Sequence, residues 1–424
     1  MILSKKDTVI SFLIASIPVF LVFSIFIAEV ILLIISILFF FDLYKAKTIK
    51  KRFTDYFLLN IFLLSYFLYV SLNSIFLEGD LLIRSTIFYF RFYIYIFAIL
   101  FYLQTLKIHE LLLKSFFITS ILLIIDGTFQ FMFKFNLLGM PLLFGNRISS
   151  FFGSELVMGS YLVRLMPLFL IFALRYNVKK IIILILLFSS MILFSGERTA
   201  LFLLFLSFSI IFFAIKKYRK MMIYASTLFI IFFVSLINFN SSYYERFTQV
   251  FYGLNLMVPE KERDDYKLPV SFFDKNNNIR MKAFSAHHQN HYAAALKIFK
   301  NNYIFGGGSK SFRFLCKKDE YQLEGPSCST HPHNIIMQFL SELGLIGFFF
   351  LFMFHSLLTR DFIKILKLKN NENGKIILIF SIIGIIINVF PLIPSGNFFN
   401  NWLSIIFAIN LANYFYLREK YIHD

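Results

Sequence analysis

The chain has 424 residues, of which 58% are hydrophobic and only 16% are charged. This composition excludes an ordinary soluble domain, in which about 25% of the residues are charged. The net charge of +18 does not indicate a nucleic-acid-binding surface, because the basic residues lie in short links between apolar runs rather than on one soluble face.

Apolar runs of about 20 residues, the length that crosses a bilayer, follow one another along the chain. The first run, 8–41, is too long for one span, and we expect a break near Pro18 and Glu29 that gives two short spans. A signal peptide is the alternative, but no small-residue cleavage site follows the run. Ten further spans are expected at 56–76, 82–103, 111–133, 157–174, 181–194, 200–215, 221–239, 334–358, 376–393 and 402–417. The sequence therefore predicts an all-α polytopic membrane protein with about twelve transmembrane helices.

The links between these spans differ in basic charge. The basic links are 45–52, 107–114, 175–180, 216–220, 360–375 and 418–420, and the links between them carry far fewer lysines and arginines. Cytoplasmic loops carry such an excess, so we expect both chain ends inside. The outer features are then 78–80, 136–155, 195–198, the long polar segment and 394–401. We divide the chain into helices one to nine (1–239), a large periplasmic loop (240–332), and helices ten to twelve with a cytoplasmic tail (333–424).

The long polar segment holds the only two cysteines, Cys316 and Cys328. In an oxidising compartment they would form a disulfide that stabilises the loop by about 3 kcal/mol, and two free thiols are the alternative. Residues 282–302 have the apolar spacing of an amphipathic helix. The glycines at 306–308 then break it; they could cradle a phosphate, but a turn after the helix is the commoner role.

The segment 329–347, STHPHNIIMQFLSELGLIG, joins the polar region to a span. If Thr330 or His331 caps the helix and Pro332 begins it, His333 lies in the first turn. Free N–H groups and the positive dipole end would there favour an anionic ligand and a neutral, basic histidine.

The same helix carries a regular polar pattern after His333. Asn334, Gln338 and Glu342 recur at every fourth residue and form one polar stripe. Gly344 and Gly347 follow with bare backbone, which would allow another helix to approach closely.

Two outer turns carry an arginine, Ser195-Gly196-Glu197-Arg198-Thr199 and Gly145-Asn146-Arg147. Either arginine could bind an anion, and snorkelling to the membrane interface is the alternative. Three more arginines, Arg84, Arg91 and Arg164, lie in or near spans, where a charge usually faces a bundle interior or a cavity. For these, pairing with Glu29, Asp126 or backbone carbonyls is as well supported as a ligand role.

Five histidines, at 287, 288, 291, 331 and 333, could suggest a metal site. No Cys-x-x-Cys or His-Glu-x-x-His pattern supports it, so we expect no metal.

Thr330-His331-Pro332-His333-Asn334, followed by Gln338, Glu342, Gly344 and Gly347, is similar to the signature of bacterial O-antigen ligases and O-antigen polymerases. The turn from Ser195 to Ala200 resembles the family's Ser-Gly-x-Arg-Thr-Ala. Supporting similarity runs from Gly145 to Leu162 and through 294–305, and the whole resemblance covers roughly residues 60–410.

This resemblance implies a GT-C-like membrane glycosyltransferase in the bacterial inner membrane, acting at the periplasmic face without metal or cofactor. Its donor would be an undecaprenyl-diphosphate-linked glycan; ligases move the glycan onto lipid A-core, and polymerases move it onto another glycan repeat. By the resemblance, His333 matches the essential histidine and Arg198 the arginine that contacts the diphosphate. The family's arginine before the alanine-rich helix is replaced by His288 here, so Arg280 or His288 takes that role, or the role is lost.

We therefore expect Arg198, Arg147 and Arg280 to neutralise the leaving diphosphate, and neutral His333 to take the proton of the acceptor hydroxyl in one inverting displacement. Glu342 is expected to support packing. A ligase is slightly favoured over a polymerase because of the histidine motif. Two different functions compete with both: a lipid-linked glycan flippase, which would show repeated halves and midplane charges, and a metal-dependent glycosyltransferase that uses Glu78 and Asp80.

Overall fold

The computed structural model describes residues 4–45, 57–76, 83–142, 146–253, 286–323, 327–369 and 371–422. This part of the chain is helical apart from its connections and one isolated bridge between Phe135 and Pro141. The long helices of the bundle are α1 (Lys5–Phe23), α2 (Ile25–Lys45), α4 (Phe57–Phe76), α5 (Arg91–Leu106), α6 (His109–Phe133), α7 (Met158–Ala173), α8 (Val178–Phe194), α9 (Arg198–Ala214), α10 (Arg219–Phe239), α14 (Ile335–Leu366), α15 (Glu372–Asn388) and α16 (Asn401–Ile422). Shorter elements are η1 (Ile83–Phe90), η2 (Ser150–Phe152), η3 (Lys216–Tyr218), α11 (Ser241–Gly253), α12 (Ala286–Asn301) and α13 (Phe312–Leu315).

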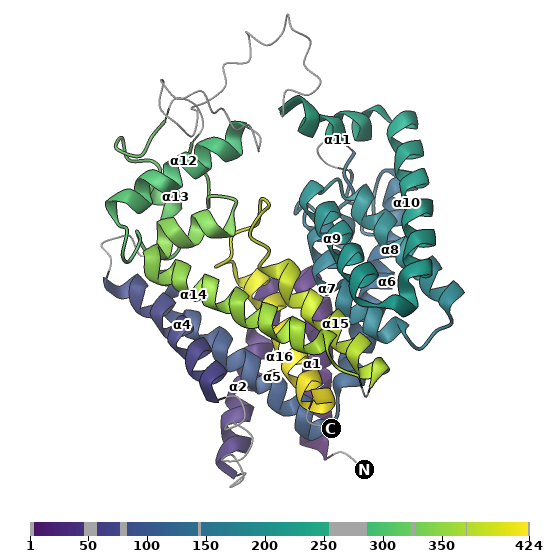
Figure 1. Cartoon of the computed structure of the whole chain (residues 1–424), viewed down its shortest axis with the longest axis horizontal. Coiled ribbons are helices and arrows are strands. Elements are labelled where there is room, and N and C mark those ends of the chain that lie inside the picture. Colours follow the sequence, from purple (N-terminus) through teal and green to yellow (C-terminus); the bar gives the residue numbers. More distant parts are fainter. Residues whose placement is uncertain are drawn as a thin grey trace, which may run out of the picture.

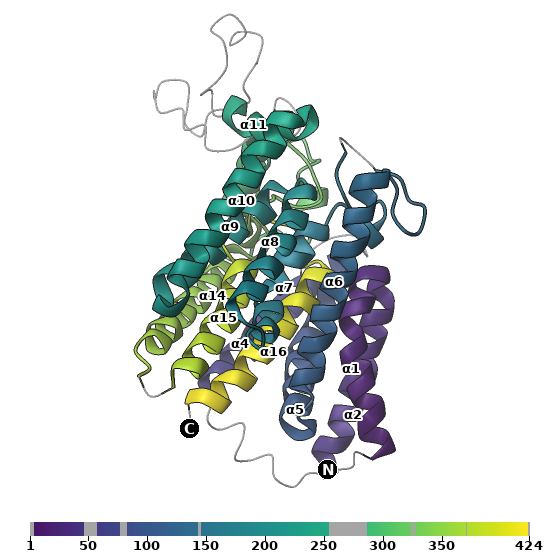
Figure 2. The ribbon, with the colours of Figure 1, turned by 90° about the vertical axis from the view of Figure 1, so that its right-hand side faces the viewer.

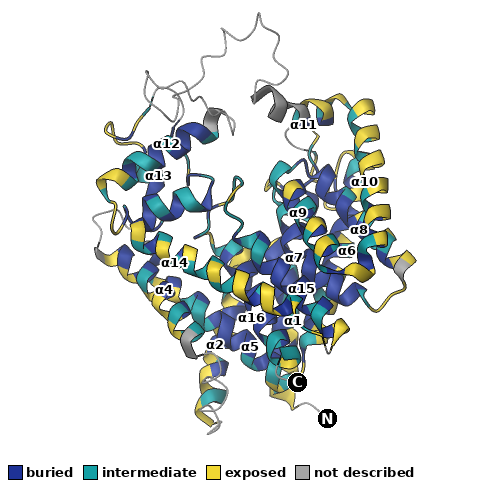
Figure 3. Ribbon diagram, in the orientation of Figure 1, coloured by how far each residue is buried: buried dark blue, intermediate teal, exposed yellow. Residues whose placement is uncertain are grey.

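A helix lies in every segment where the sequence predicts a span. Six stretches are long and apolar enough to cross a membrane: Lys5–Phe23, Ile25–Lys45, Thr86–Leu106, His109–Phe133, Lys216–Phe239 and Ile335–Leu366. Exposed apolar side chains on the outside of the bundle, such as Ile231 and Phe239 of α10, agree with a lipid-facing surface (Figure 3). The chain is thus an all-helical, multi-pass membrane protein.

The first two helices meet at Ser24, which lies between the two residues where a break was expected. Pro18 is inside α1 and Glu29 is inside α2. Ser24 has an extended backbone, and its hydroxyl accepts a hydrogen bond from the Ile27 amide. A serine that caps a new helix therefore sets the boundary, and the proline lies within α1 without ending it.

The centre of the bundle is α7, which packs against α6, α8, α9, α15 and α16. All of its residues except Ser160 are buried. A helix that is apolar around its whole circumference belongs in a core. Figures 1 and 2 show the two chain ends at the end of the bundle opposite α11 and α12.

Helix α14 is interrupted at Gly344, where φ is +67°. The segment 303–308 satisfies the backbone groups that the kink exposes: Leu345 N donates to Tyr303 O (2.8 Å), and the amides of Gly307 and Gly308 donate to Ser341 O (2.8 Å) and Glu342 O (2.9 Å). Such replacement bonds are what allow a broken helix at membrane depth. The expectation that another helix approaches Gly344 and Gly347 is wrong. A loop fills the space at Gly344, and a Cβ at Gly347 would meet Leu343 of the same helix.

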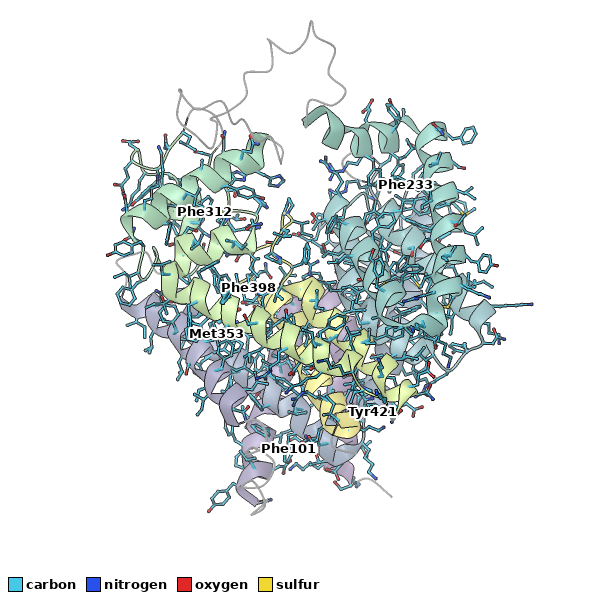
Figure 4. The ribbon with its side chains drawn as sticks, in the orientation of Figure 1. Phe101, Phe233, Phe312, Met353, Phe398 and Tyr421 are labelled. Carbon is cyan, nitrogen blue, oxygen red and sulfur yellow. A yellow bond between two sulfur atoms is a disulfide. The ribbon has the colours of Figure 1, made fainter. Side chains whose placement is uncertain are left out.

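A second, smaller core lies beside the start of α14. It consists of Ala294, Ala295 and Ile298 of α12 with Phe312, Cys316 and Tyr321, and Figure 4 labels Phe312 within it. Cys316 and Cys328 form a disulfide with Cα atoms 5.2 Å apart. The amphipathic helix predicted for 282–302 is present as α12, although residues 282–285 lie outside the described part. This small core fixes α12 against α14.

Candidate functional site

The histidine motif lies just before α14. Asn334 caps the helix, and its side-chain oxygen accepts hydrogen bonds from the amides of Ile336 (2.9 Å) and Met337 (3.1 Å). The predicted start, with Thr330 or His331 as the cap and Pro332 as the first helical residue, is wrong. His333 is outside the helix in a left-handed conformation, with φ +58°.

The loop that joins α15 to α16 holds the motif from the other side. His331 Nε2 donates to Ser395 O (3.0 Å), and Ser395 N donates to His333 O (2.8 Å). Asn334 Nδ2 donates to Pro391 O (2.8 Å). This pairing explains the choice of cap, because Asn334 alone can cap the helix and hold the loop at once. It also fixes the unusual backbone of His333.

Four imidazole rings surround this point. The His333 ring lies with its centroid 4.0 Å from that of His331, 5.2 Å from that of His291 and 5.4 Å from that of His288. Burial lowers the pKa of His333, and burial followed by the neighbouring His333 lowers the pKa of His331 to about 3. Both rings are therefore neutral at pH 7, which leaves His333 able to accept a proton. We name His288, His291, His331 and His333 the histidine cluster.

Metal binding has no support in the geometry of this cluster. Over the stretches that the structure describes, no three His, Cys, Asp or Glu side chains are arranged to hold an ion.

The polar stripe of α14 is a buried frame behind the histidine cluster. Gln338 Nε2 donates to Glu342 Oε2 (2.9 Å) and to Asn397 Oδ1 (2.8 Å), and its Oε1 accepts from the Phe398 amide (3.0 Å). Glu342 also accepts from Phe312 N (3.2 Å). Gln338 and Glu342 are both fully buried. The stripe thus connects α14, the small core and the 391–398 loop, and it makes no contact with solvent.

The second part of the site is the turn before α9. Glu197 is the N-cap of α9, and its carboxylate accepts from Gly159 N (2.7 Å), Ser160 N (3.1 Å) and Ser160 Oγ (2.5 Å). These are the free amides at the start of α7, where a negative charge is favourable. The turn therefore binds the beginnings of α7 and α9 to each other.

Three arginines surround this turn, and we name Arg147, Arg198 and Arg246 the arginine cluster. Arg147 Nε donates to Ser195 O (2.8 Å), and Arg246 Nε donates to Gly196 O (3.0 Å). Among the described residues, the Arg198 side chain has no hydrogen-bond partner. Burial, followed by the charge of Arg246, lowers the pKa of Arg147. The cluster is thus a concentration of positive charge with one guanidinium free to bind a ligand.

Sequence reasoning missed Arg246. It lies in α11, in the run Ser-Ser-Tyr-Tyr-Glu-Arg-Phe directly after a span, and the amphipathic character of that run is the signal that could have indicated it.

One pocket is lined by neighbours of both parts of the site. Its wall includes Thr199 of α9, which follows Arg198, and Ile335 of α14, close to His333; Arg164, Pro394, Ser395 and Phe398 also line it. Figure 4 labels Phe398 where the 391–398 loop meets the bundle. The neighbours of Arg198 and of His333 therefore face the same space.

The remaining candidate residues are placed as follows. His288 belongs to the histidine cluster, not the arginine cluster. Arg280, Glu78, Asp80 and the side chain of Arg84 lie outside the described residues. Arg91 pairs with Glu29 (3.2 Å). Asp126 accepts from Ser150 Oγ (2.6 Å) and Leu137 N (2.8 Å), and it pairs with neither Arg91 nor Arg164.

Comparison with known proteins supplies one match. Residues 182–352 match the family model described as O-antigen ligase. The matched segment contains Arg198, Arg246, the histidine cluster and the polar stripe, whereas Arg147 and Arg164 precede it. No curated protein matches the chain.

Proposed function

Because residues 182–352 carry the O-antigen ligase family domain, we propose that the chain is a membrane glycosyltransferase of lipopolysaccharide synthesis. It transfers an undecaprenyl-diphosphate-linked O-antigen glycan onto lipid A-core. The observation that carries this proposal is that a neutral histidine, His333, and a cluster of arginines around Arg198 adjoin one pocket through their neighbours Ile335 and Thr199. These two kinds of group are what transfer of a sugar from a diphosphate requires.

His333 acts as the general base. An acceptor sugar hydroxyl is a poor nucleophile, and it reacts at neutral pH when a base takes its proton. A base must be unprotonated to do this, and burial keeps the His333 ring in that form by lowering its pKa. In the left-handed backbone held by Ser395, the ring stands ahead of α14.

The arginine cluster stabilises the leaving group. As the hydroxyl oxygen bonds to the anomeric carbon, the bond from that carbon to the diphosphate oxygen breaks, and the diphosphate takes the electron pair. Fixed guanidinium groups stabilise the charge that develops there. Arg198, which is free, contacts the diphosphate directly, and Arg147 and Arg246 are held beside it by the carbonyls of the turn. One displacement inverts the anomeric carbon.

Replacement of the base tests the proposal. His333→Ala should remove glycan transfer by about 10²–10⁴-fold while the protein remains in the membrane at normal level. The matched control is His355→Gln, since His355 lies farther along α14 and only bonds backbone carbonyls of Leu351 and Val389. The measurement is surface polysaccharide in a complemented deletion strain; near wild-type polysaccharide with His333→Ala would refute the role of this residue.

Ligase and polymerase differ in the acceptor. The deletion strain separates them: loss of all attached O-chain identifies a ligase, whereas core with one repeat identifies a polymerase. Formation of no new glycosidic bond, with glycan lipid moved across vesicles, would instead identify a flippase. The gathering of the site residues at one end of the bundle favours an enzyme over that last function.

We place the protein in the bacterial inner membrane, with about twelve spans and the site at the periplasmic face. The disulfide in the small core supports an oxidising compartment for that end of the bundle. Non-reducing mass spectrometry of protein from membranes should find Cys316 linked to Cys328, and free thiols would contradict the periplasmic placement.

A further inference from the structure

Arg164 is an arginine inside the membrane bundle that the proposed mechanism does not use. It lies in the second turn of α7 and is 5% exposed. It also lines the pocket that Thr199, Ile335 and Ser395 share. An ionisable side chain at such a position is costly unless a partner or a ligand compensates its charge. Snorkelling cannot explain it, because α7 is surrounded by neighbouring helices and has no lipid-facing side.

Protein groups compensate Arg164 poorly. Its Nη1 donates to Ser160 O at 3.5 Å, a long bond within its own helix. Its Nε has no partner in the described part of the chain, and no described carboxylate forms an ion pair with it. Arginines on neighbouring helices differ in this respect, since Arg91 pairs with Glu29 (3.2 Å) and Arg418 with Asp361 (3.2 Å).

A second unpartnered group faces the same pocket. Ser395 Oγ is buried and has no hydrogen-bond partner among the described residues. The backbone of Ser395 is already used, because it binds His331 and His333. A guanidinium and a hydroxyl are therefore both available on the wall of one pocket, and together they suit an anionic oxygen.

The position of Arg164 along α7 gives its depth relative to the arginine cluster. Glu197 bonds the amides of Gly159 and Ser160, so α7 and α9 begin at the same level. Arg164 follows Ser160 by four residues, which places its Cα about 6 Å further along the helix axis. Its side chain turns back toward Ser160, as helical side chains do. The guanidinium therefore lies close to the start of α7, where Glu197 of the turn bonds Ser160.

We propose that Arg164 and Ser395 form a second phosphate subsite that binds one phosphate of the donor diphosphate, while the arginine cluster binds the other. This inference rests on the proposed function, because it assumes a lipid diphosphate ligand. The charges agree: the Glu197 carboxylate acts on Arg147, Arg164 and Arg246 together, and a diphosphate would supply further negative charge. The planar fork of Arg164 suits a phosphate, and occupation by phosphate ends the isolation of its charge.

Direct binding tests the subsite without catalysis. The full chain in detergent is titrated with farnesyl diphosphate and with farnesyl monophosphate. Emission of Trp402, the only tryptophan, reports binding, because it directly precedes Leu403 and Ser404 of the pocket wall. The wild type should bind the diphosphate at least tenfold more tightly than the monophosphate. Equal binding of the two by the wild type overturns the inference.

Three variants test separately the charge of Arg164, its planar guanidinium and the hydroxyl of Ser395. Arg164→Gln should weaken diphosphate binding at least tenfold, Arg164→Lys should weaken it less, and Ser395→Ala should weaken it two- to fivefold. Arg91→Gln is the matched control and should bind like the wild type. Diphosphate binding by Arg164→Gln within twofold of the wild type overturns the inference. If Arg164→Gln does not fold, wild-type binding by both Arg164→Lys and Ser395→Ala overturns it instead.

His333→Ala separates this inference from the proposed function. It should bind farnesyl diphosphate normally and transfer no glycan. If it transfers glycan while Arg164→Gln loses binding, the assignment of the base fails and the phosphate subsite stands.

Discussion

The histidine cluster and the arginine cluster are built in opposite ways. Neutral hydrogen bonds to backbone groups hold the histidine cluster, and burial removes the charge of its His331 and His333 rings by lowering their pKa. In the arginine cluster, two guanidinium groups donate hydrogen bonds to carbonyls of one turn. The Glu197 carboxylate of the same turn bonds the first amides of α7, and Glu197 is itself the N-cap of α9. The difference fits the two tasks of glycan transfer: a base works only when it is uncharged, and a departing diphosphate needs fixed positive charge.

Among changes in the arginine cluster, removal of the Arg198 guanidinium should reduce glycan transfer the most. Arg198→Ala should lower transfer by about 10²–10³-fold, the usual loss when one donor to a developing charge is removed. Arg198→Lys keeps the charge and should still be impaired, because Lys cannot make two parallel bonds to a phosphate. The assay is in vitro transfer from a lipid-linked donor with purified protein.

The comparison of lysine with arginine also tests the idea of two unlike clusters. Arg219→Lys is the control, since Arg219 only bonds carbonyls at the end of α9. Equal activity of Arg198→Lys and the wild type would mean that simple charge suffices on this side of the pocket.

Substitutions in the buried polar stripe of α14, behind the histidine cluster, should have the next largest effect on transfer. Gln338→Leu has a similar shape but removes the bonds to Glu342, Asn397 and the Phe398 amide. Each buried group left unpaired costs about 1–3 kcal/mol. We expect a lower unfolding temperature. We also expect transfer about tenfold slower, which corresponds to a rise of about 1.4 kcal/mol in the activation free energy. Thermal unfolding and transfer are measured on the same preparation.

Ser341→Ala is the matched control for Gln338→Leu. Ser341 is equally buried on the same helix, but its hydroxyl bonds only carbonyls of its own helix. Farnesyl diphosphate binding by Gln338→Leu should weaken no more than it does in Ser395→Ala, because the arginine cluster and Arg164 are intact and only the loop that carries Ser395 loses its bonds to Gln338. Loss of that binding would show that the two clusters are not independent.

These features differ in how far the sequence could predict them. Hydrophobic length located every helix of the bundle, since burial of apolar runs depends little on neighbours. The first residue of α14 could not be predicted, because Thr330, His331 and Asn334 are all possible N-caps. Asn334 is the cap because its side chain also donates to the carbonyls of Pro391 and Ile393, which are distant in sequence. The kink at Gly344 could not be predicted for the same reason. It depends on the 303–308 loop, whose carbonyls accept hydrogen bonds from the amides that the kink frees.

Only part of the candidate site could be predicted from the sequence. His333 and Arg198 stand in short recognisable motifs, and the structure places their neighbours on one pocket. Arg246 and Arg164 have no motif. Their positions follow from the approach of α11 to the turn and from the central place of α7, and both are consequences of packing between distant segments.

The smallest expected effect is a difference between the clusters in their response to pH. In the proposed mechanism His333 acts as the neutral ring, and burial lowers its pKa below the ordinary 6.5. Transfer should therefore persist as the pH falls through 6.5 and decline only below the lowered pKa, where the ring is protonated. The rings that face it are His288, His291 and His331, and the charges of Arg313 and His291 act on His331 to lower its pKa. Arginines stay charged throughout, so any change in farnesyl diphosphate binding over the same interval should follow the terminal phosphate of the ligand, which gains a proton at about pH 6.

Stability adds a second acid effect that must be separated from the loss of the base. His331 has a pKa of about 3 in the folded protein and about 6.5 when unfolded. The unfolded chain therefore binds a proton that the folded chain does not, and stability falls as the pH decreases from 6.5 toward 3. Brief exposure to acid followed by assay at pH 7 distinguishes the two, because protonation of His333 reverses at once and unfolding does not. Transfer that declines in parallel with diphosphate binding would contradict the division of roles, since it would show that one titrating group controls both sides of the pocket.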